Sequence, residues 1–117
     1  MTDTGLGDKT VAELIAMFEE EARHECRETL VVLRNSVVVE EIINRGRGIL
    51  GSIAEYLERT RPVNGVRMSW GYVLSWVGIE LDLFPIPLTY DDLNAWIAWA
   101  NQHAVNAPKL PSATWGD

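Results

Sequence analysis

The first third of the chain repeats apolar residues at the spacing of an α-helix. Charged residues fill the positions in between, as in a helix that buries one face against a core. Thr10 and Glu13 have the spacing of a capping box, in which each side chain accepts a backbone N–H at the start of a helix. We therefore predict a helix over residues 10–33. Its apolar positions are Val11, Leu14, Ile15, Phe18, Ala22, Cys26, Leu30 and Leu33.

A second helix is predicted over residues 36–45, although the sequence there also suits a hairpin. Residues 30–43 are rich in β-branched side chains and contain an Arg-Asn-Ser turn. The helical spacing of apolar residues continues across this segment, however. In addition, the neighbouring Glu40 and Glu41 would put one carboxylate on a buried sheet face. Ser36 is the expected N-cap of this helix.

Three glycines then interrupt the helical pattern, namely Gly46, Gly48 and Gly51. After them, Ser52 and Glu55 form a second capping box, which predicts a helix starting at Ser52. This helix should end at Thr60, because the residue that follows precedes a proline and is disfavoured in the α conformation. Residues 62–65, with the sequence Pro-Val-Asn-Gly, are predicted to form a turn.

The segment over residues 66–84 fits two structures. Interpreted as a helix, it spans residues 69–77 and ends at Gly78, followed by extended chain. Interpreted as a short hairpin, it alternates apolar and polar residues along two strands. We favour the helix and keep the hairpin as the alternative. Two prolines make residues 84–87 irregular, because proline has no N–H to donate.

The last predicted helix opens at Thr89. Asp91 and Asp92 fall in its first turn, where the positive end of the helix dipole favours carboxylates. Apolar residues then recur at helical spacing, at Leu93, Trp96, Ile97, Ala100 and Ala104. The arc that they cover, with Trp99 added, is wider than one packed face needs. This width indicates that one of the rings faces another chain or a ligand.

Length and composition agree with one small domain. The chain has 117 residues, 47% of them hydrophobic and 23% charged, as is typical of globular proteins. We predict a mainly α, single-domain bundle of four to five helices over residues 9–105, with a short hairpin within 66–84 as the alternative. Residues 1–8 would be a flexible leader without signal-peptide features, and residues 106–117 an irregular arm. The single cysteine, Cys26, excludes an intrachain disulfide and favours the cytoplasm.

The formal net charge of -7 is unevenly distributed. Residues 1–44 carry -6, residues 45–67 carry +3, and residues 68–117 carry -4. The overall acidity makes a nucleic-acid partner improbable, whereas the basic segment suits an acidic surface. The longest uncharged apolar stretch, over residues 68–79, is shorter than the ~20 residues that span a bilayer. We expect no membrane association.

Two motifs have the spacing of known sites of chemistry. Residues 46–51 match the Gly-x-Gly-x-x-Gly pattern of dinucleotide sites, but acids precede them and the expected acidic residue about 20 positions later is missing. Small residues at a helix break explain this motif better. Glu21 and His24 have the spacing of metal ligands on a helix, yet no second such pair exists in the sequence. We predict no catalytic residue, no cofactor and no metal.

These observations favour a non-catalytic protein-protein interaction module, such as a small regulator, adaptor or assembly subunit. The expected partner is another protein with an acidic surface, and self-association into a homo-oligomer is also expected. The alternative is a small-molecule-binding protein or small enzyme with a tryptophan-lined pocket, in which His103 acts with Glu80 or Asp82. The predicted partner-binding residues are Trp70, Trp76, Trp96, Trp99, His103, Arg59, Arg61 and Arg67.

Overall fold

Five helices make up most of the residues that the structure, a computed structural model, describes, namely 4–24 and 33–104. They are α1 (Val11–His24), α3 (Val37–Arg45), α4 (Arg47–Thr60), α5 (Asn64–Leu81) and α6 (Leu93–His103). No residue in those two ranges lies in a β-strand. The prediction of a small helical bundle with four to five helices is confirmed.

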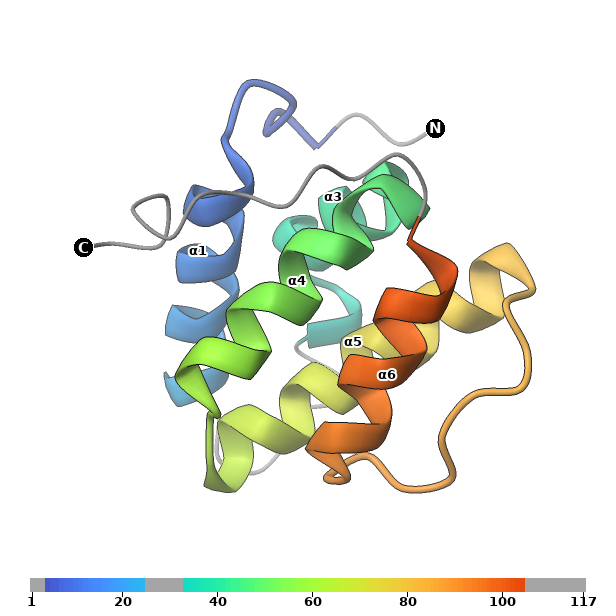
Figure 1. The fold of residues 1–117 in the computed structure, drawn as a ribbon. Helices are drawn as coiled ribbons and strands as arrows, with labels where there is room; N and C mark the ends of the chain where they lie inside the picture. Colours follow the sequence, from blue (N-terminus) through green and yellow to red (C-terminus); the bar gives the residue numbers. More distant parts are fainter. Residues whose placement is uncertain (1–3, 25–32, 105–117) are drawn as a thin grey trace.

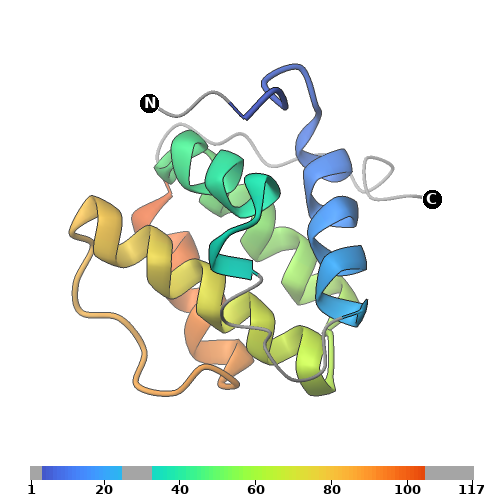
Figure 2. The same cartoon turned by 180° about the vertical axis from the view of Figure 1, so that it is seen from behind.

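The helices surround one apolar core. α4 and α6 lie side by side on one side of the molecule (Figure 1), and α5 crosses behind them, as the view from the back shows (Figure 2). α1 and α3 pack against α5 and complete the bundle. Burying one large apolar side chain contributes about 1.5–3 kcal/mol, so this core supplies the main folding force. Its largest fully buried members include Phe18, Leu33, Ile42, Ile53, Leu57, Leu74, Trp70 and Trp96.

The starts of α1 and α3 are set by the capping residues that the sequence predicts. The Thr10 backbone N–H donates to Glu13 Oε1 over 2.8 Å, and the Glu13 N–H donates to Thr10 Oγ1 over 3.1 Å. Ser36 Oγ accepts from the backbone N–H of Val38 over 3.0 Å. Both helices therefore begin where orphan N–H groups find an acceptor. The part of the predicted first helix over residues 25–32 lies outside the described residues.

The break before α4 falls at Gly46 alone, which corrects the prediction of a helix from Ser52. Gly46 has a φ of 61° and joins α3 to α4 directly. Ser52 is buried in the middle of α4, and Gly48 and Gly51 are also helical. The helix continues through them because its apolar residues on both sides of Ser52 reach the same core. The predicted end at Thr60 is confirmed.

Helix α5 spans 18 residues, so the predicted helix over 69–77 was too short and the alternative hairpin was wrong. The helix starts at Asn64, within the predicted turn, and runs through Gly78 rather than stopping there. Asp82, with a φ of 59°, forms its C-cap. Gly78 lies at a position of the helix where tertiary packing leaves no room for a side chain: a Cβ there would lie 2.9 Å from the Trp99 ring.

The start of α6 lies four residues after the predicted start at Thr89. The side chain of Asp92 caps the helix by accepting from the Ala95 N–H over 3.3 Å. Thr89 is in the preceding turn, where its carbonyl accepts a hydrogen bond from a tryptophan. Residues 84–87 are irregular, as predicted, and the Phe84–Pro85 peptide bond is cis. The predicted arm over 106–117 lies outside the described residues.

The end of the expected flexible leader is attached to α3 in the structure. The Thr4 hydroxyl donates to Glu41 Oε1 over 2.5 Å. Arg45 bonds the other oxygen of Glu41 over 2.9 Å and also donates to the backbone carbonyls of Leu6 and Lys9. One carboxylate and one guanidinium of α3 thus hold the chain that leads into α1.

Candidate functional site

Three of the predicted partner-binding tryptophans are buried in the core. The exposed fractions of Trp70, Trp96 and Trp99 do not exceed 3%. The expectation that Trp96 or Trp99 faces another chain or a ligand is therefore corrected. The wide apolar arc of α6 is filled from within the protein, because α4 covers one side of the helix and α5 with its following loop covers the other.

The indole N–H groups of these two tryptophans hold the connection between α5 and α6, which we call the clamped loop (residues 82–92). Trp99 Nε1 donates to the Leu83 carbonyl over 3.0 Å, near the start of the loop. Trp96 Nε1 donates to the Thr89 carbonyl over 2.9 Å, near its end. A carbonyl that is shielded from water and has no donor lowers the stability of the fold by about 1–3 kcal/mol. These two bonds therefore fix both ends of the loop.

Two glycines of α5 let the clamped loop approach closely. A Cβ on Gly71 would lie 2.0 Å from the Tyr90 carbonyl oxygen, and a Cβ on Gly78 would lie 2.8 Å from Cγ2 of Ile86. The two glycines are seven residues apart, which places them on the same face of the helix two turns from each other. The loop therefore runs back along α5. At its two closest contacts with the helix, the helix residue is a glycine.

The clamped loop directs apolar side chains into solvent. Leu88 is 99% exposed and Phe84 54%, and both lie between the two tryptophan-bound carbonyls. Tyr90 is 45% exposed, and Ile79 near the end of α5 is 57% exposed. Single exposed apolar residues are common on proteins, but several on one ordered segment are typical of an interaction site. We call these four residues the display surface.

An aromatic row on α5 extends from the display surface. The ring of Tyr90 lies edge-on to Tyr72 at 4.6 Å between centroids, and Tyr72 stacks on Trp76 at 6.4 Å. The guanidinium carbon of Arg34 lies 5.6 Å from the centre of the Trp76 ring. Trp76 is half-buried. Of the tryptophans predicted to bind a partner, Trp76 is the one that is not fully buried, and Tyr72 connects its ring to the exposed Tyr90.

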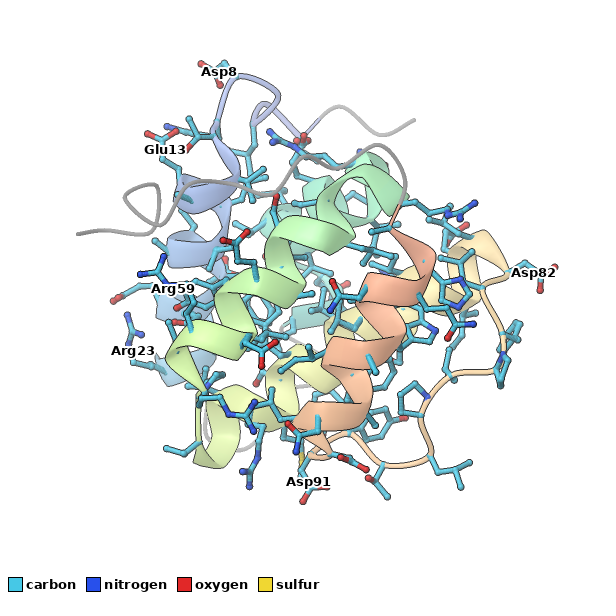
Figure 3. The ribbon with its side chains drawn as sticks, in the orientation of Figure 1. Asp8, Glu13, Arg23, Arg59, Asp82 and Asp91 are labelled. Atoms are coloured by element: carbon cyan, nitrogen blue, oxygen red, sulfur yellow. The ribbon has the colours of Figure 1, made fainter. Side chains whose placement is uncertain are left out.

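Acidic residues stand at both ends of the clamped loop. Glu80 and Asp82 precede its apolar part, and Asp91 and Asp92 follow it. Figure 3 shows the labelled Asp82 and Asp91 pointing outward at opposite ends of the loop. Asp92 caps α6, whereas Glu80, Asp82 and Asp91 have no side-chain ion pair within the two described ranges. The display surface is thus framed by carboxylates.

The predicted arginines do not join the tryptophans in one surface. Arg59 and Arg61 are exposed at the end of α4, and Arg61 donates to Asn94 Oδ1 over 2.8 Å. Arg67 is half-buried in α5, and its Nε has no hydrogen-bond partner in the described part of the chain. In Figure 3, Arg59 lies on the opposite side of the molecule from Asp82.

His103 is placed against the core rather than in a pocket with acidic partners. Its ring lies 5.3 Å from that of Trp99, and its Nε2 is buried without a hydrogen-bond partner among the residues described. Its backbone carbonyl accepts from Arg47 Nε over 2.7 Å. Within the described residues, His103 makes no hydrogen bond or ion pair with Glu80 or Asp82, the acids expected beside it in the alternative prediction.

A cavity of about 360 Å³ lies between α4 and α6. Glycine and alanine form part of its wall, and Glu55, Glu58, Arg59 and Asn101 supply the polar groups. None of the described residues that line this cavity is a tryptophan or His103, so the cavity differs from the tryptophan-lined pocket of the alternative prediction. The complete described lining is Gly51, Ala54, Glu55, Glu58, Arg59, Asn101 and Ala104.

Glu21, one of the two candidate metal ligands on α1, has a structural role instead. Glu21 Oε1 accepts a 2.6 Å hydrogen bond from the Ser36 hydroxyl, which ties α1 to the start of α3. Over residues 4–24 and 33–104, no three His, Cys, Asp or Glu side chains gather closely enough to hold a metal ion. Cys26 lies outside these ranges.

A buried carboxylate that the sequence analysis did not single out joins three helices. Glu19 of α1 accepts from the Tyr56 hydroxyl of α4 over 2.5 Å and from Trp70 Nε1 of α5 over 2.8 Å. Burial, together with the hydrogen bond to Glu19, raises the pKa of Tyr56 well above its usual value. These residues are 37 and 51 positions from Glu19, so no local sequence pattern links them.

Comparisons with protein-family models, with curated proteins and with solved structures find no match to this chain. None of the helices in the described ranges combines the length and the apolar content of a transmembrane span. A helical bundle supports many unrelated functions, so the function must be inferred from the exposed side chains and their chemistry.

Proposed function

We propose that this protein is a non-catalytic protein-protein interaction module that docks on its partner through the clamped loop. The observation that carries the proposal is the almost complete exposure of Leu88 on a loop with both ends fixed by buried tryptophans. A cytoplasmic regulator, adaptor or assembly subunit would use such a surface.

Fixing the loop before binding favours association. A flexible loop loses conformational freedom when it docks, and that loss opposes binding by about 0.5–1.5 kcal/mol for each immobilised side chain. Here Trp96, Trp99 and the glycines of α5 already restrict the backbone in the free protein. Transfer of Leu88 from water into an apolar pocket would then contribute about 1.5–3 kcal/mol with little opposing entropy from the backbone.

In this proposal the predicted tryptophans have two different roles. Trp96 and Trp99 support the loop from inside and do not touch the partner. Trp76, half-buried at the end of the aromatic row, lies at the margin of the docking surface. The direct contacts come from Phe84, Leu88 and Tyr90, whose exposure depends on the loop conformation.

The test is affinity purification from the source cells with quantitative mass spectrometry, using the tagged full chain and two variants. Leu88→Ser removes the most exposed apolar side chain of the loop, and Val63→Ser is the matched control, because Val63 is 59% exposed on the connection between α4 and α5. Both variants should keep the wild-type free energy of unfolding within about 0.5 kcal/mol.

The two variants should co-purify with different sets of proteins. Loss of a Leu88 contact of about 1.5 kcal/mol or more lowers affinity at least about tenfold, so specific partners should disappear with Leu88→Ser and remain with Val63→Ser. If both variants retain the same proteins as the wild type, the clamped loop is not the docking element and the proposal is wrong.

A small-molecule site is the second candidate, and the cavity between α4 and α6 is the observation that favours it. Its volume of about 360 Å³ lies at the small end of the range for ligand pockets. A panel of metabolites should then raise the melting temperature in a saturable way, and Glu58→Gln should weaken that response. If no metabolite raises the melting temperature, the cavity is not a ligand site and this second candidate is wrong.

A further inference from the structure

The charged residues on the clamped loop and on the last turn of α5 all have one sign. Residues 68–104 contain Glu80, Asp82, Asp91 and Asp92 but no lysine or arginine. Two arginines of other elements contact neutral groups and keep their charge, since Arg34 lies over the Trp76 ring and Arg61 donates to Asn94 Oδ1. The loop and the last turn of α5 therefore present apolar side chains within a field of negative potential.

The carboxylates of Glu80, Asp82 and Asp91 are available for intermolecular contacts. All three residues are exposed, and none has an ion pair or side-chain hydrogen bond in the ranges that the structure describes. Asp82 serves α5 through its backbone and Asp91 supports the turn before α6 through its carbonyl, so neither role uses the side-chain carboxylate. Their charge is not needed for the fold.

This arrangement disfavours three other kinds of partner for the display surface. An anionic lipid headgroup or a nucleic-acid phosphate would be repelled by carboxylates at both ends of the loop. An acidic protein surface, the partner expected from the arginine-rich segment, would be repelled in the same way. A protein with basic side chains around an apolar pocket is attracted, and its rim would meet the carboxylates while Leu88 enters the pocket.

We infer that the partner of this protein is a basic protein surface, with lysine or arginine side chains arranged around an apolar pocket that receives Leu88. This inference rests on the proposed function and specifies its partner class. The juxtaposition that supports it is the 99% exposed Leu88 between Asp82 and Asp91 on a loop fixed by Trp96 and Trp99.

Three synthetic probes test the inference. They are amphipathic helical peptides with the same leucine stripe, flanked by lysine, by glutamine or by glutamate, and labelled for fluorescence anisotropy. The lysine peptide should bind at least about tenfold more tightly than the glutamine peptide, and the glutamate peptide most weakly. Raising the salt concentration from about 0.05 M to about 0.5 M should remove most of this preference, because exposed charges are then screened.

Charge variants show whether the preference arises at the loop. The triple variant Glu80→Gln, Asp82→Asn, Asp91→Asn should reduce the preference for lysine about tenfold, since each exposed ion pair changes affinity by up to about fivefold. Asparagine suits the positive φ of residue 82, so the C-cap of α5 is retained. The control Asp8→Asn, Glu20→Gln, Glu40→Gln changes the net charge equally, on other elements than the loop, and should keep the preference. If both triple variants behave alike, the attraction is a nonspecific effect of net charge and the inference is wrong.

Leu88→Ser separates failure of this inference from failure of the proposed function. If the lysine and glutamine peptides bind equally and both lose binding with Leu88→Ser, the docking surface stands and the basic partner is wrong. If no peptide binding depends on Leu88, both ideas fail. Binding of the loop to anionic vesicles would overturn the basic partner. Self-association that Leu88→Ser abolishes in sedimentation would also overturn it, because a second copy would then occupy the surface.

Discussion

The backbone of Gly71 in α5 lies directly against the Tyr90 carbonyl, so close that a Cβ on Gly71 would lie 2.0 Å from that oxygen. The contact joins the first half of α5 to the end of the clamped loop. It also places the Tyr90 ring beside Tyr72 and thereby connects the loop to the aromatic row. The exposed surface of this protein thus depends on a residue that has no side chain.

Gly71→Ala should destabilise the protein and displace the loop. The methyl group meets backbone atoms of Tyr90, which cannot rotate away as a side chain could, so we expect a loss of about 1–3 kcal/mol in the free energy of unfolding. The control Gly65→Ala, with no atom within 4 Å of its Cβ, should be neutral or stabilising by up to about 1 kcal/mol. Urea denaturation of both variants checks this, and equal stability of the two would contradict the close contact.

Trp99→Phe should loosen the start of the clamped loop. The variant removes the indole donor and leaves the Leu83 carbonyl buried without a partner, which should cost about 1–3 kcal/mol. Hydrogen exchange in residues 82–92 should accelerate as well. Trp76→Phe is the control, because Trp76 is half-buried and has no indole hydrogen bond in the described chain. If Trp76→Phe accelerates exchange in the loop as much, the clamp is not the cause.

Stability should fall at alkaline pH because of Tyr56. Burial and the neighbouring Glu19 raise the pKa of Tyr56, so above about pH 10 the unfolded chain loses this proton while the folded chain retains it. The folded state binds more protons there, and the free energy of unfolding decreases as the pH rises. Urea denaturation at a series of pH values above 9 should show a shallower decrease for Tyr56→Phe. Tyr90→Phe, at an exposed position, should retain the wild-type slope.

Acidification should release the segment before α1. A hydrogen bond from Thr4 and the adjacent Arg45 lower the pKa of Glu41, so its carboxylate contributes stability above the pKa of the unfolded chain, near 4.3. This stability is lost as the pH falls through the lower pKa of the folded state. Glu41→Gln should flatten the decline of the free energy of unfolding below about pH 5, and Glu40→Gln, one residue earlier, should not. Equal slopes for the two variants would show that Glu41 is not the titrating group.

The sequence alone could not predict which side chains of the clamped loop are exposed to solvent. The run Phe84-Pro85-Ile86-Pro87-Leu88 does combine apolar residues with prolines that prevent regular structure, and this signal could have indicated an apolar loop. It does not say which side chains point outward. Ile86 packs against Gly78 whereas Leu88 is in solvent, and that difference depends on where α5 and α6 place the loop.

Local chemistry in the sequence by itself determined the helical class, the caps at Thr10 and Ser36, and the end of α4 at Thr60, because capping and helical periodicity act over three or four residues. Tertiary structure alone decided that α5 passes through its glycines and that the tryptophans of α6 are buried and donate hydrogen bonds to the loop. Those outcomes depend on contacts between residues that are distant along the chain. Such contacts decide which atom is buried, which carbonyl receives a donor, and which leucine remains in water.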